Sequence, residues 1–204
     1  MAVIGYLFSA SGYQYVGIGK EIYDRTWDMR QFYDKVEKKN NEFKINKLAF
    51  MGPKEELLKE DNGVIINAAY QAGIVAVLQK QKINPEQMAA YKSGEIAMLA
   101  SSGAFSFDGT LSLLFRKQAM TAAELDRSKF TSFMVNSVPL DKISQVISEV
   151  NKKIKAEVVS YNAPDSVTVT CEVVIKDNLK QVVAKLGGTV LDLPNEELCN
   201  FSLL

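Results

Sequence analysis

The sequence contains no histidine among its 204 residues. Histidine is the side chain that most often takes up and returns a proton near neutral pH, and serine and cysteine nucleophiles usually depend on it. Ser-His and Cys-His catalysis are therefore excluded within this chain. Any catalysis by this chain must use a base other than histidine.

Cysteine is also scarce. The two cysteines, Cys171 and Cys199, lie far apart and belong to no C-x-x-C pair, so the pattern indicates neither a disulfide framework nor a metal site. Both are expected to be buried free thiols. The sequence predicts no metal and no cofactor.

The sequence also lacks an excess of charge and a long apolar run. Its 24 basic and 24 acidic residues are scattered, so there is no electrostatic footprint for nucleic acid or an anionic membrane. The longest apolar run, 64–78, contains Asn67 and Gln71 and is shorter than the about 20 residues that a membrane span requires. The apolar start, MAVIGYLFSASG, has no basic segment of the kind that begins a signal peptide. We expect a cytoplasmic protein that binds neither nucleic acid nor membrane.

Hydrophobic residues make up 47% of the chain, which is enough for the core of one large domain or two small ones. In the amino-terminal part, a glycine-rich loop follows the first apolar segment, and one later helix is apolar nearly all round, which is typical of a helix buried inside a domain. The elements predicted here are a strand at 3–8, one helix between 20 and 39, a loop and a short acidic helix at 53–59, the apolar helix at 63–81, a strand at 88–91, and helices at 94–101 and 108–124.

The carboxy-terminal part shows a clearer alternation of periods. The predicted elements are a strand at 129–135, a helix at 140–150, a strand at 157–161, a turn at NAPD, a strand from 166 to 173 with one buried face, a helix around 179–186, and a strand at 189–193. Their order, β-α-β-β-α-β, is the ferredoxin-like arrangement.

The stretch AYKSGE, residues 90–95, runs from a predicted strand directly into a predicted helix. This is the layout of the G-x-S-x-G elbow, in which a sharp turn displays one reactive side chain. Here Gly94 matches the last glycine of the motif, but the display position holds Lys92.

Several further segments, taken with this elbow, resemble the malonyl-CoA:acyl carrier protein transacylases and the acyltransferase domains of polyketide synthases. GYQYVGIGK resembles the family's G-S-Q-x-V-G-M-G, MGPKEEL its x-G-P-x-E-E-L, AYKSGE its G-H-S-L-G-E, GAFSFDGTLSLL its G-x-x-x-F-x-x-A-x-x-L, RKQAM its R-G-x-x-M, and SYNAPDSVTV its N-x-N-S-P-x-Q-x-V-I. The order of elements agrees over essentially the whole length.

The resemblance implies an α/β fold with two parts. An α/β-hydrolase-like large subdomain would occupy 1–126, an inserted ferredoxin-like small subdomain 127–198, and 199–204 would return toward the large subdomain, with the active site between the two. Family members continue beyond this point, so the resemblance implies either a fragment or a natural truncation. In the second case another protein or a second copy would cover the open surface, and the apolar ending CNFSLL favours a covered surface over a frayed tail.

In that family a serine on the elbow attacks malonyl-CoA and a histidine receives its proton, while backbone amides and a glutamine hold the oxyanion and an arginine binds the malonyl carboxylate. Carried over position by position, these roles fall on Lys92 (nucleophile), Asn200 (general base), Ser11 (oxyanion) and Arg116 (carboxylate), with Tyr91 and Gln14 as further substrate-binding positions. Only the arginine is retained among the four principal roles.

These replacements predict the loss of transferase chemistry. An acylated serine is an ester that a carrier thiol can attack, whereas an acylated lysine is an amide that resists cleavage, and Asn200 cannot take up a proton at neutral pH. We expect a degenerate acyltransferase, without enzymatic turnover, that binds an acyl carrier protein or a subunit of a fatty-acid or polyketide synthase. Lys92 and Arg116 would then form a cationic pocket for an acidic acyl group, such as that of a CoA thioester.

Three alternatives remain open from the sequence. Ser93, with a lysine as its base, or Lys92 itself would serve as an altered nucleophile in a working acyltransferase or hydrolase. Arg116 would be a solvated surface residue rather than a ligand. The chain would be a plain subunit of a hetero-oligomer whose partner carries the intact active site.

Overall fold

The computed structural model describes residues 3–124, 129–150 and 156–193. The chain divides into two compact units, Met1–Ala119 and Met120–Leu204. The domain boundary predicted at 126/127 and the return predicted at 199–204 lie outside the described residues. No described helix has both the length and the apolar composition that crossing a membrane requires.

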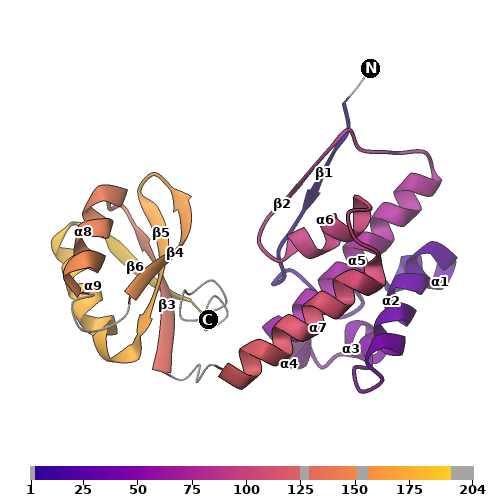
Figure 1. The fold of residues 1–204 in the computed structure, drawn as a ribbon, viewed down its shortest axis with the longest axis horizontal. Helices are drawn as coiled ribbons and strands as arrows, with labels where there is room; N and C mark the ends of the chain where they lie inside the picture. Colours follow the sequence, from indigo (N-terminus) through magenta and orange to yellow (C-terminus); the bar gives the residue numbers. More distant parts are fainter. Residues whose placement is uncertain (1–2, 125–128, 151–155, 194–204) are drawn as a thin grey trace. The chain divides into compact units, whose positions relative to one another are not determined.

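Unit 1 combines a short parallel sheet with helices (Figure 1). Strands β1 and β2 pair in parallel, with Gly5 opposite Gln87 and Phe8 opposite Ala90. The elements of this unit are β1 (Gly5–Phe8), α1 (Lys20–Arg25), α2 (Trp27–Lys39), α3 (Ile45–Met51), α4 (Lys54–Leu57), α5 (Glu60–Lys80), β2 (Gln87–Ala90), α6 (Gly94–Ser101) and α7 (Phe107–Glu124), the last of which contains the division between the units.

Helix α5 lies at the centre of unit 1, with α2 and α6 packed against it. Its residues from 63 to 69 are all buried, as the nearly uniform apolar composition predicts. A Cβ added to Gly73 would meet the side chain of Met29 on α2, so this glycine permits the close approach of the two helices. The predicted buried helix is confirmed.

The prediction of one helix between 20 and 39 is wrong in its continuity. Thr26 adopts an extended conformation between α1 and α2. Its hydroxyl oxygen accepts a hydrogen bond from the Met29 N–H at 3.3 Å and donates to the Ile22 carbonyl at 3.0 Å. Threonine therefore ends one helix and caps the next, as short hydroxyl side chains commonly do. The structure differs from the prediction at a second place, because α3 is a helix where a loop was predicted.

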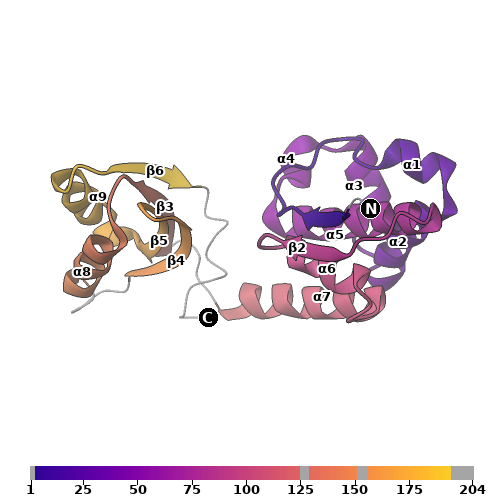
Figure 2. The same cartoon turned by 90° about the horizontal axis from the view of Figure 1, so that it is seen from above.

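Unit 2 is a four-stranded antiparallel sheet in the order β4-β5-β3-β6. Figures 1 and 2 show α8 and α9 on the same face of this sheet. The element order β-α-β-β-α-β is the one predicted from periodicity. Its elements are β3 (Phe130–Asn136), α8 (Leu140–Val150), β4 (Ala156–Ala163), β5 (Ser166–Glu172), a 3-10 turn (Val173–Ile175), α9 (Lys176–Lys185) and β6 (Thr189–Leu193).

Strand β5 departs from its predicted half-buried character. Five consecutive residues, 167–171, are buried, because β5 lies inside the sheet between β3 and β4. On the face expected to be exposed, the Thr170 hydroxyl is hydrogen-bonded to the Ser132 hydroxyl of β3 at 2.7 Å. Paired hydroxyls satisfy each other, so threonine and serine are tolerated at buried positions of this strand.

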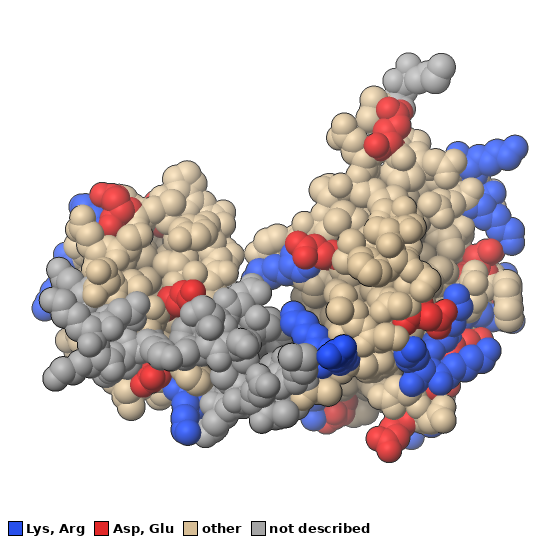
Figure 3. All heavy atoms as spheres, in the orientation of Figure 1, with Lys and Arg blue, Asp and Glu red and all other residues tan. Residues whose placement is uncertain are grey.

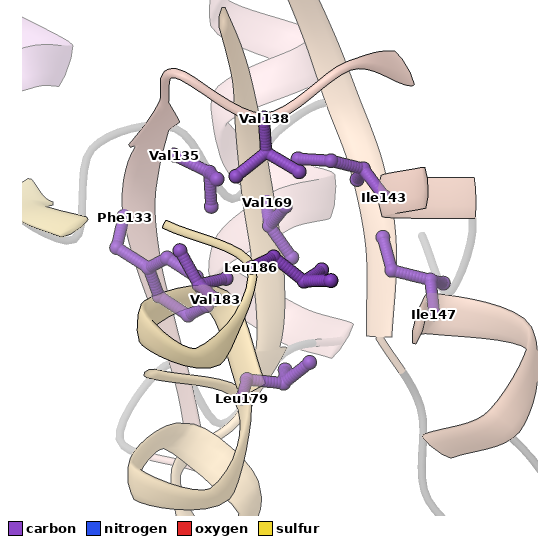
Figure 4. Close-up of a pocket in the computed structure, with 9 residues that line it drawn as sticks. All are labelled: Phe133, Val135, Val138, Ile143, Ile147, Val169, Leu179, Val183 and Leu186. Atoms are coloured by element: carbon purple, nitrogen blue, oxygen red, sulfur yellow. The ribbon is translucent and has the colours of Figure 1, made fainter. Parts of the chain in front are cut away.

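The core of unit 2 is close-packed between the sheet and its two helices. Apolar side chains line a void of about 10 Å³. Figure 4 shows them: Phe133, Val135, Val138, Ile143, Ile147, Val169, Leu179, Val183 and Leu186. A space of this size barely holds one water molecule. This void is therefore a packing feature and not a ligand pocket.

Candidate functional site

The predicted elbow is present at the carboxyl end of β2. After Ala90 the chain turns through Tyr91, Lys92 and Ser93 and enters α6 at Gly94. Lys92 has φ = 49°, a left-handed conformation that non-glycine residues seldom adopt and that often marks functional sites. The Tyr91 N–H donates to the Phe8 carbonyl of β1 at 3.0 Å, so the turn begins as an extension of the sheet.

The tightness of the turn depends on Gly94. A Cβ at this position would lie 2.5 Å from the carbonyl oxygen of Phe8 and 2.7 Å from that of Ser9. Both are backbone atoms at the end of β1, and they cannot move aside as a flexible side chain would. Only glycine therefore lets α6 start this close to the neighbouring strand.

The Lys92 side chain lies beside its own neighbour in the sequence. Its Nζ is 5.3 Å from the centre of the Tyr91 ring, which is within the range of a cation–π contact. The Tyr91 side chain is 57% exposed. The contact brings together the predicted nucleophile position and one of the predicted substrate-binding positions.

The loop after β1 is attached to α5 by two amide side chains. The Ser9 carbonyl accepts hydrogen bonds from Asn67 Nδ2 at 2.8 Å and from Gln71 Nε2 at 2.9 Å, and the Ser9 N–H donates to Gln71 Oε1 at 3.1 Å. The sequence did not predict a role for these two residues. The available signal was their spacing, since two amides four residues apart on an otherwise apolar helix lie on one face.

Gln14 shapes the same loop from within. Its side chain is 5% exposed; Oε1 accepts a hydrogen bond from the Gly12 N–H at 2.6 Å, and Nε2 donates to the Leu57 carbonyl at 3.1 Å. Both ends of the amide are thus bonded to the backbone of this chain. This arrangement positions the loop, and a role for Gln14 in substrate binding stays a prediction.

Ser11 and Ser93 meet at the elbow although 82 positions separate them. The Ser11 N–H donates to Ser93 Oγ at 2.8 Å, and the Ser93 hydroxyl donates to Ser11 Oγ at 3.3 Å. The structure therefore brings together the predicted oxyanion position and the predicted alternative nucleophile. Neither partner of the Ser93 hydroxyl can act as a base at neutral pH.

The remaining predicted residues are not part of this cluster. Arg116 is an exposed residue of α7, and it takes part in none of the elbow contacts described above. Asn200 lies outside the described residues. On the face shown in Figure 3, basic and acidic side chains are interspersed, and within the described ranges no cluster of three or more potential metal ligands occurs.

The clearest pKa shifts belong to core residues. Burial raises the pKa of the Tyr33 hydroxyl, which donates to the Ile18 carbonyl at 3.0 Å. Burial likewise raises the pKa of the Cys171 thiol to about 12, with a smaller opposing effect of Lys176. Cys171 is thus the buried free thiol that was predicted, while Cys199 lies outside the described residues. Neither group has the properties of a reactive side chain.

No protein-family model matches the chain. Among curated relatives, the malonyl CoA-acyl carrier protein transacylase of Bacillus subtilis is 34% identical over 110 residues, which are 52% of this chain and 33% of that protein. Highly reducing polyketide synthase 40 of Fusarium pseudograminearum is 26% identical over 185 residues, covering 83% of this chain and 7% of the synthase. The chain therefore spans a third or less of the length of these relatives.

Solved structures agree with the sequence relatives. A malonyl CoA-acyl carrier protein transacylase from Clostridium perfringens superposes with a TM-score of 0.83 at 21% identity, over 95% of this chain and 61% of that one. A malonyl-transacylase solved in complex with a type II polyketide synthase acyl carrier protein gives a TM-score of 0.83 at 18% identity, over 94% and 62%. Similarity at this identity establishes the fold. The relatives and structural neighbours of this chain are thus malonyl-CoA:acyl carrier protein transacylases and polyketide synthases, which confirms the family resemblance seen in its motifs.

Proposed function

We propose that this chain is part of a transacylase-like protein that keeps the acyltransferase fold, lacks acyl-transfer turnover, and binds an acyl carrier protein or a synthase subunit. One observation carries the proposal: the strained display position of the elbow holds Lys92. The elbow itself is intact, from the β1–β2 pairing to the close approach of Gly94. The side chain that it displays is the wrong one for reversible exchange.

The chemical reason is the stability of the acyl product. A serine alkoxide and a carrier thiol exchange an acyl group through an ester and a thioester, so each step is reversible. If the amine of Lys92 attacked a thioester, the carbon–sulfur bond would break, the thiol would leave, and an amide would form after loss of one amine proton. An amide is not cleaved by a thiol at a useful rate, so the protein would stop after one event.

Two observations support a binding role. One solved neighbour is a malonyl-transacylase in complex with an acyl carrier protein, and the match covers 94% of this chain and 62% of that one. Unit 1 also presents two cationic side chains, Lys92 and Arg116, at the positions that the family resemblance assigns to the nucleophile and the carboxylate ligand.

We propose that unit 1 belongs to an α/β-hydrolase-like subdomain and that unit 2 is the inserted ferredoxin-like subdomain.

The test of this proposal is an acyl-transfer assay with a matched binding measurement. The protein is incubated with malonyl-CoA and a carrier protein bearing its phosphopantetheine thiol, beside an active transacylase as positive control. We expect no malonylated carrier protein above the background without protein, but saturable binding of the carrier protein by calorimetry. Malonyl transfer with turnover would refute the loss of function, and the absence of binding would refute the partner.

The role of Arg116 is tested in the same system. If Arg116 binds the malonyl carboxylate, Arg116→Ala weakens malonyl-CoA binding by roughly 10- to 150-fold, because a hydrogen bond to a charged group is worth about 1.5–3 kcal/mol. Arg25→Ala is the control, since Arg25 is an exposed arginine paired with Glu21 on α1. Equal affinities of the two variants would make Arg116 a surface residue.

A second function is favoured by the display of Lys92 on the left-handed turn of the elbow. In this alternative the protein is an acyltransferase or acyl hydrolase that uses Lys92 or Ser93 as its nucleophile on a CoA or carrier-protein thioester. Thioester cleavage is compared in the wild type, Lys92→Ala and Ser93→Ala. A large loss in either variant supports the alternative, and identical rates in all three exclude it.

A further inference from the structure

The hydrogen bond between Ser11 and Ser93 occupies a functionally important place in the elbow. In elbow enzymes the oxyanion of the reacting acyl group is held by two backbone donors, the N–H of the residue after the nucleophile and an N–H from the loop after a neighbouring strand. By position, the first donor here is the Ser93 N–H. The second is the Ser11 N–H in the loop after β1, and it already donates to Ser93 Oγ at 2.8 Å.

The hydroxyl of Ser93 is committed to this contact rather than to its own helix. Ser93 is the N-cap residue of α6, yet its side chain makes no capping hydrogen bond, although serine at this position usually does so. The first helical N–H groups are satisfied by the turn instead, with Gly94 donating to the Tyr91 carbonyl at 3.0 Å and Glu95 to the Lys92 carbonyl at 3.1 Å. The hydroxyl is therefore available for the loop.

The loop holds the Ser11 N–H in place on both sides. Before it, the Ser9 backbone is bonded to Asn67 and Gln71 of α5. After it, the Gly12 N–H is bonded to the buried Gln14 side chain at 2.6 Å. A donor fixed in this way cannot easily turn toward a new acceptor, so a substrate carbonyl would have to displace the Ser93 hydroxyl.

We infer that Ser93 closes the oxyanion site of this elbow from within, because its hydroxyl takes the Ser11 N–H that a substrate's carbonyl oxygen would need. This inference rests on the proposed function, since it concerns the same elbow. The Ser93 hydroxyl acts here by occupying the Ser11 N–H and not by reacting. The occupied donor is a second obstacle to catalysis, independent of Lys92. Returning a hydroxyl to position 92 would then leave the site short of one donor.

The hydrogen bond itself is tested by amide hydrogen exchange, measured by NMR on the wild type, Ser93→Ala and Ser93→Thr. A net hydrogen bond contributes about 0.5–1.5 kcal/mol, so exchange of the Ser11 amide should become roughly 2- to 10-fold faster in Ser93→Ala. Ser93→Thr keeps a hydroxyl and should retain protection. An unchanged Ser11 exchange rate in Ser93→Ala overturns the inference.

Its consequence is tested with p-nitrophenyl acetate on Lys92→Ser and on the double variant Lys92→Ser/Ser93→Ala. In the reaction the introduced hydroxyl oxygen bonds to the acetyl carbon, its proton passes to water, and p-nitrophenolate leaves. One oxyanion donor is worth about 10²–10³ in rate when fully placed, so the double variant should form acyl-protein at least tenfold faster, measured by intact mass.

Equal rates in these two variants, including no acylation in either, overturn the inference. The proposed function fails by a different observation, malonyl transfer by the wild-type protein. The two failures are therefore distinguishable, because one concerns the wild type with carrier protein and the other concerns the Ser11 amide and the paired Lys92→Ser variants.

Discussion

The two units of this chain organise their sheets differently. Unit 2 has a four-stranded antiparallel sheet whose helices lie on one face over a continuous apolar core. Unit 1 has only two described strands, paired in parallel, and the loop after β1 is joined to residues far away in the sequence by side-chain-to-backbone hydrogen bonds. Unit 2 therefore depends chiefly on apolar burial, whereas the elbow of unit 1 depends on a few polar contacts and one glycine.

The largest expected loss of stability follows from removing a large side chain from the core of unit 2. Phe133 is fully buried, and Phe133→Ala should lower the free energy of unfolding of unit 2 by about 3–5 kcal/mol through lost burial and a cavity. Hydrogen exchange read by mass spectrometry should show the loss in unit 2 and unchanged protection in unit 1. Leu191→Ala, at a position 58% exposed, is the control. Equal loss of protection in both units would show that they unfold together.

In unit 1 the corresponding destabilising substitution is Gly94→Ala. The new Cβ would overlap the backbone carbonyls of Phe8 and Ser9, and overpacking of this kind costs about 1–3 kcal/mol. Gly5→Ala is the matched control, because its Cβ would lie at an ordinary 4.0 Å from the nearest atom, the Gln87 carbonyl. Chemical denaturation should separate the two variants. Similar stabilities would mean that α6 can shift away from β1.

A smaller effect is expected from Gln14→Leu, which removes polar contacts but keeps the bulk. The buried Leu57 carbonyl would lose its donor and the exposed Gly12 N–H could turn to water, so the cost should be about 1–2 kcal/mol. Gln79→Leu, on an exposed position of α5, should change stability by less than about 0.5 kcal/mol. If the two variants are equally stable, the Gln14 amide does not hold the loop.

At neutral pH the smallest effect is that of the Cys171 thiol, because its titration changes stability only at alkaline pH. Burial raises the pKa of the Cys171 thiol from 9.0 to about 12. Above pH 9 the unfolded chain releases this proton while the folded chain keeps it, so unit 2 should lose stability as the pH rises from 9 toward 12. Cys171→Ala should be less stable overall but have a flatter pH dependence, measured by denaturation at each pH. Parallel curves would contradict the assigned shift.

The difference between the units also explains what the sequence could predict. Helix α8 and strand β6 were predicted with their observed bounds, because their apolar residues repeat at the period of the element. The break at Thr26 was missed because a threonine inside an apolar repeat gives no clear stop signal. The two-sided burial of β5 depends on its place in the sheet, which local periodicity does not contain.

Part of the candidate site was likewise predictable from local sequence, and part was not. The elbow was predicted because strand, turn and helix are consecutive in the sequence, and the position of Lys92 follows from them. The Ser11–Ser93 hydrogen bond joins residues 82 positions apart, and it requires the pairing of β1 with β2 together with the closeness of Gly94. No local sequence pattern predicts such a contact.

The central claim, that the residue displayed by the elbow prevents reversible acyl exchange, is tested most directly by intact-mass spectrometry of the wild-type protein after exposure to malonyl-CoA. We predict either no adduct or a single malonyl adduct on Lys92 that persists when a carrier thiol is added. A malonyl adduct that the carrier thiol removes, with the protein returning to its original mass, would contradict the account.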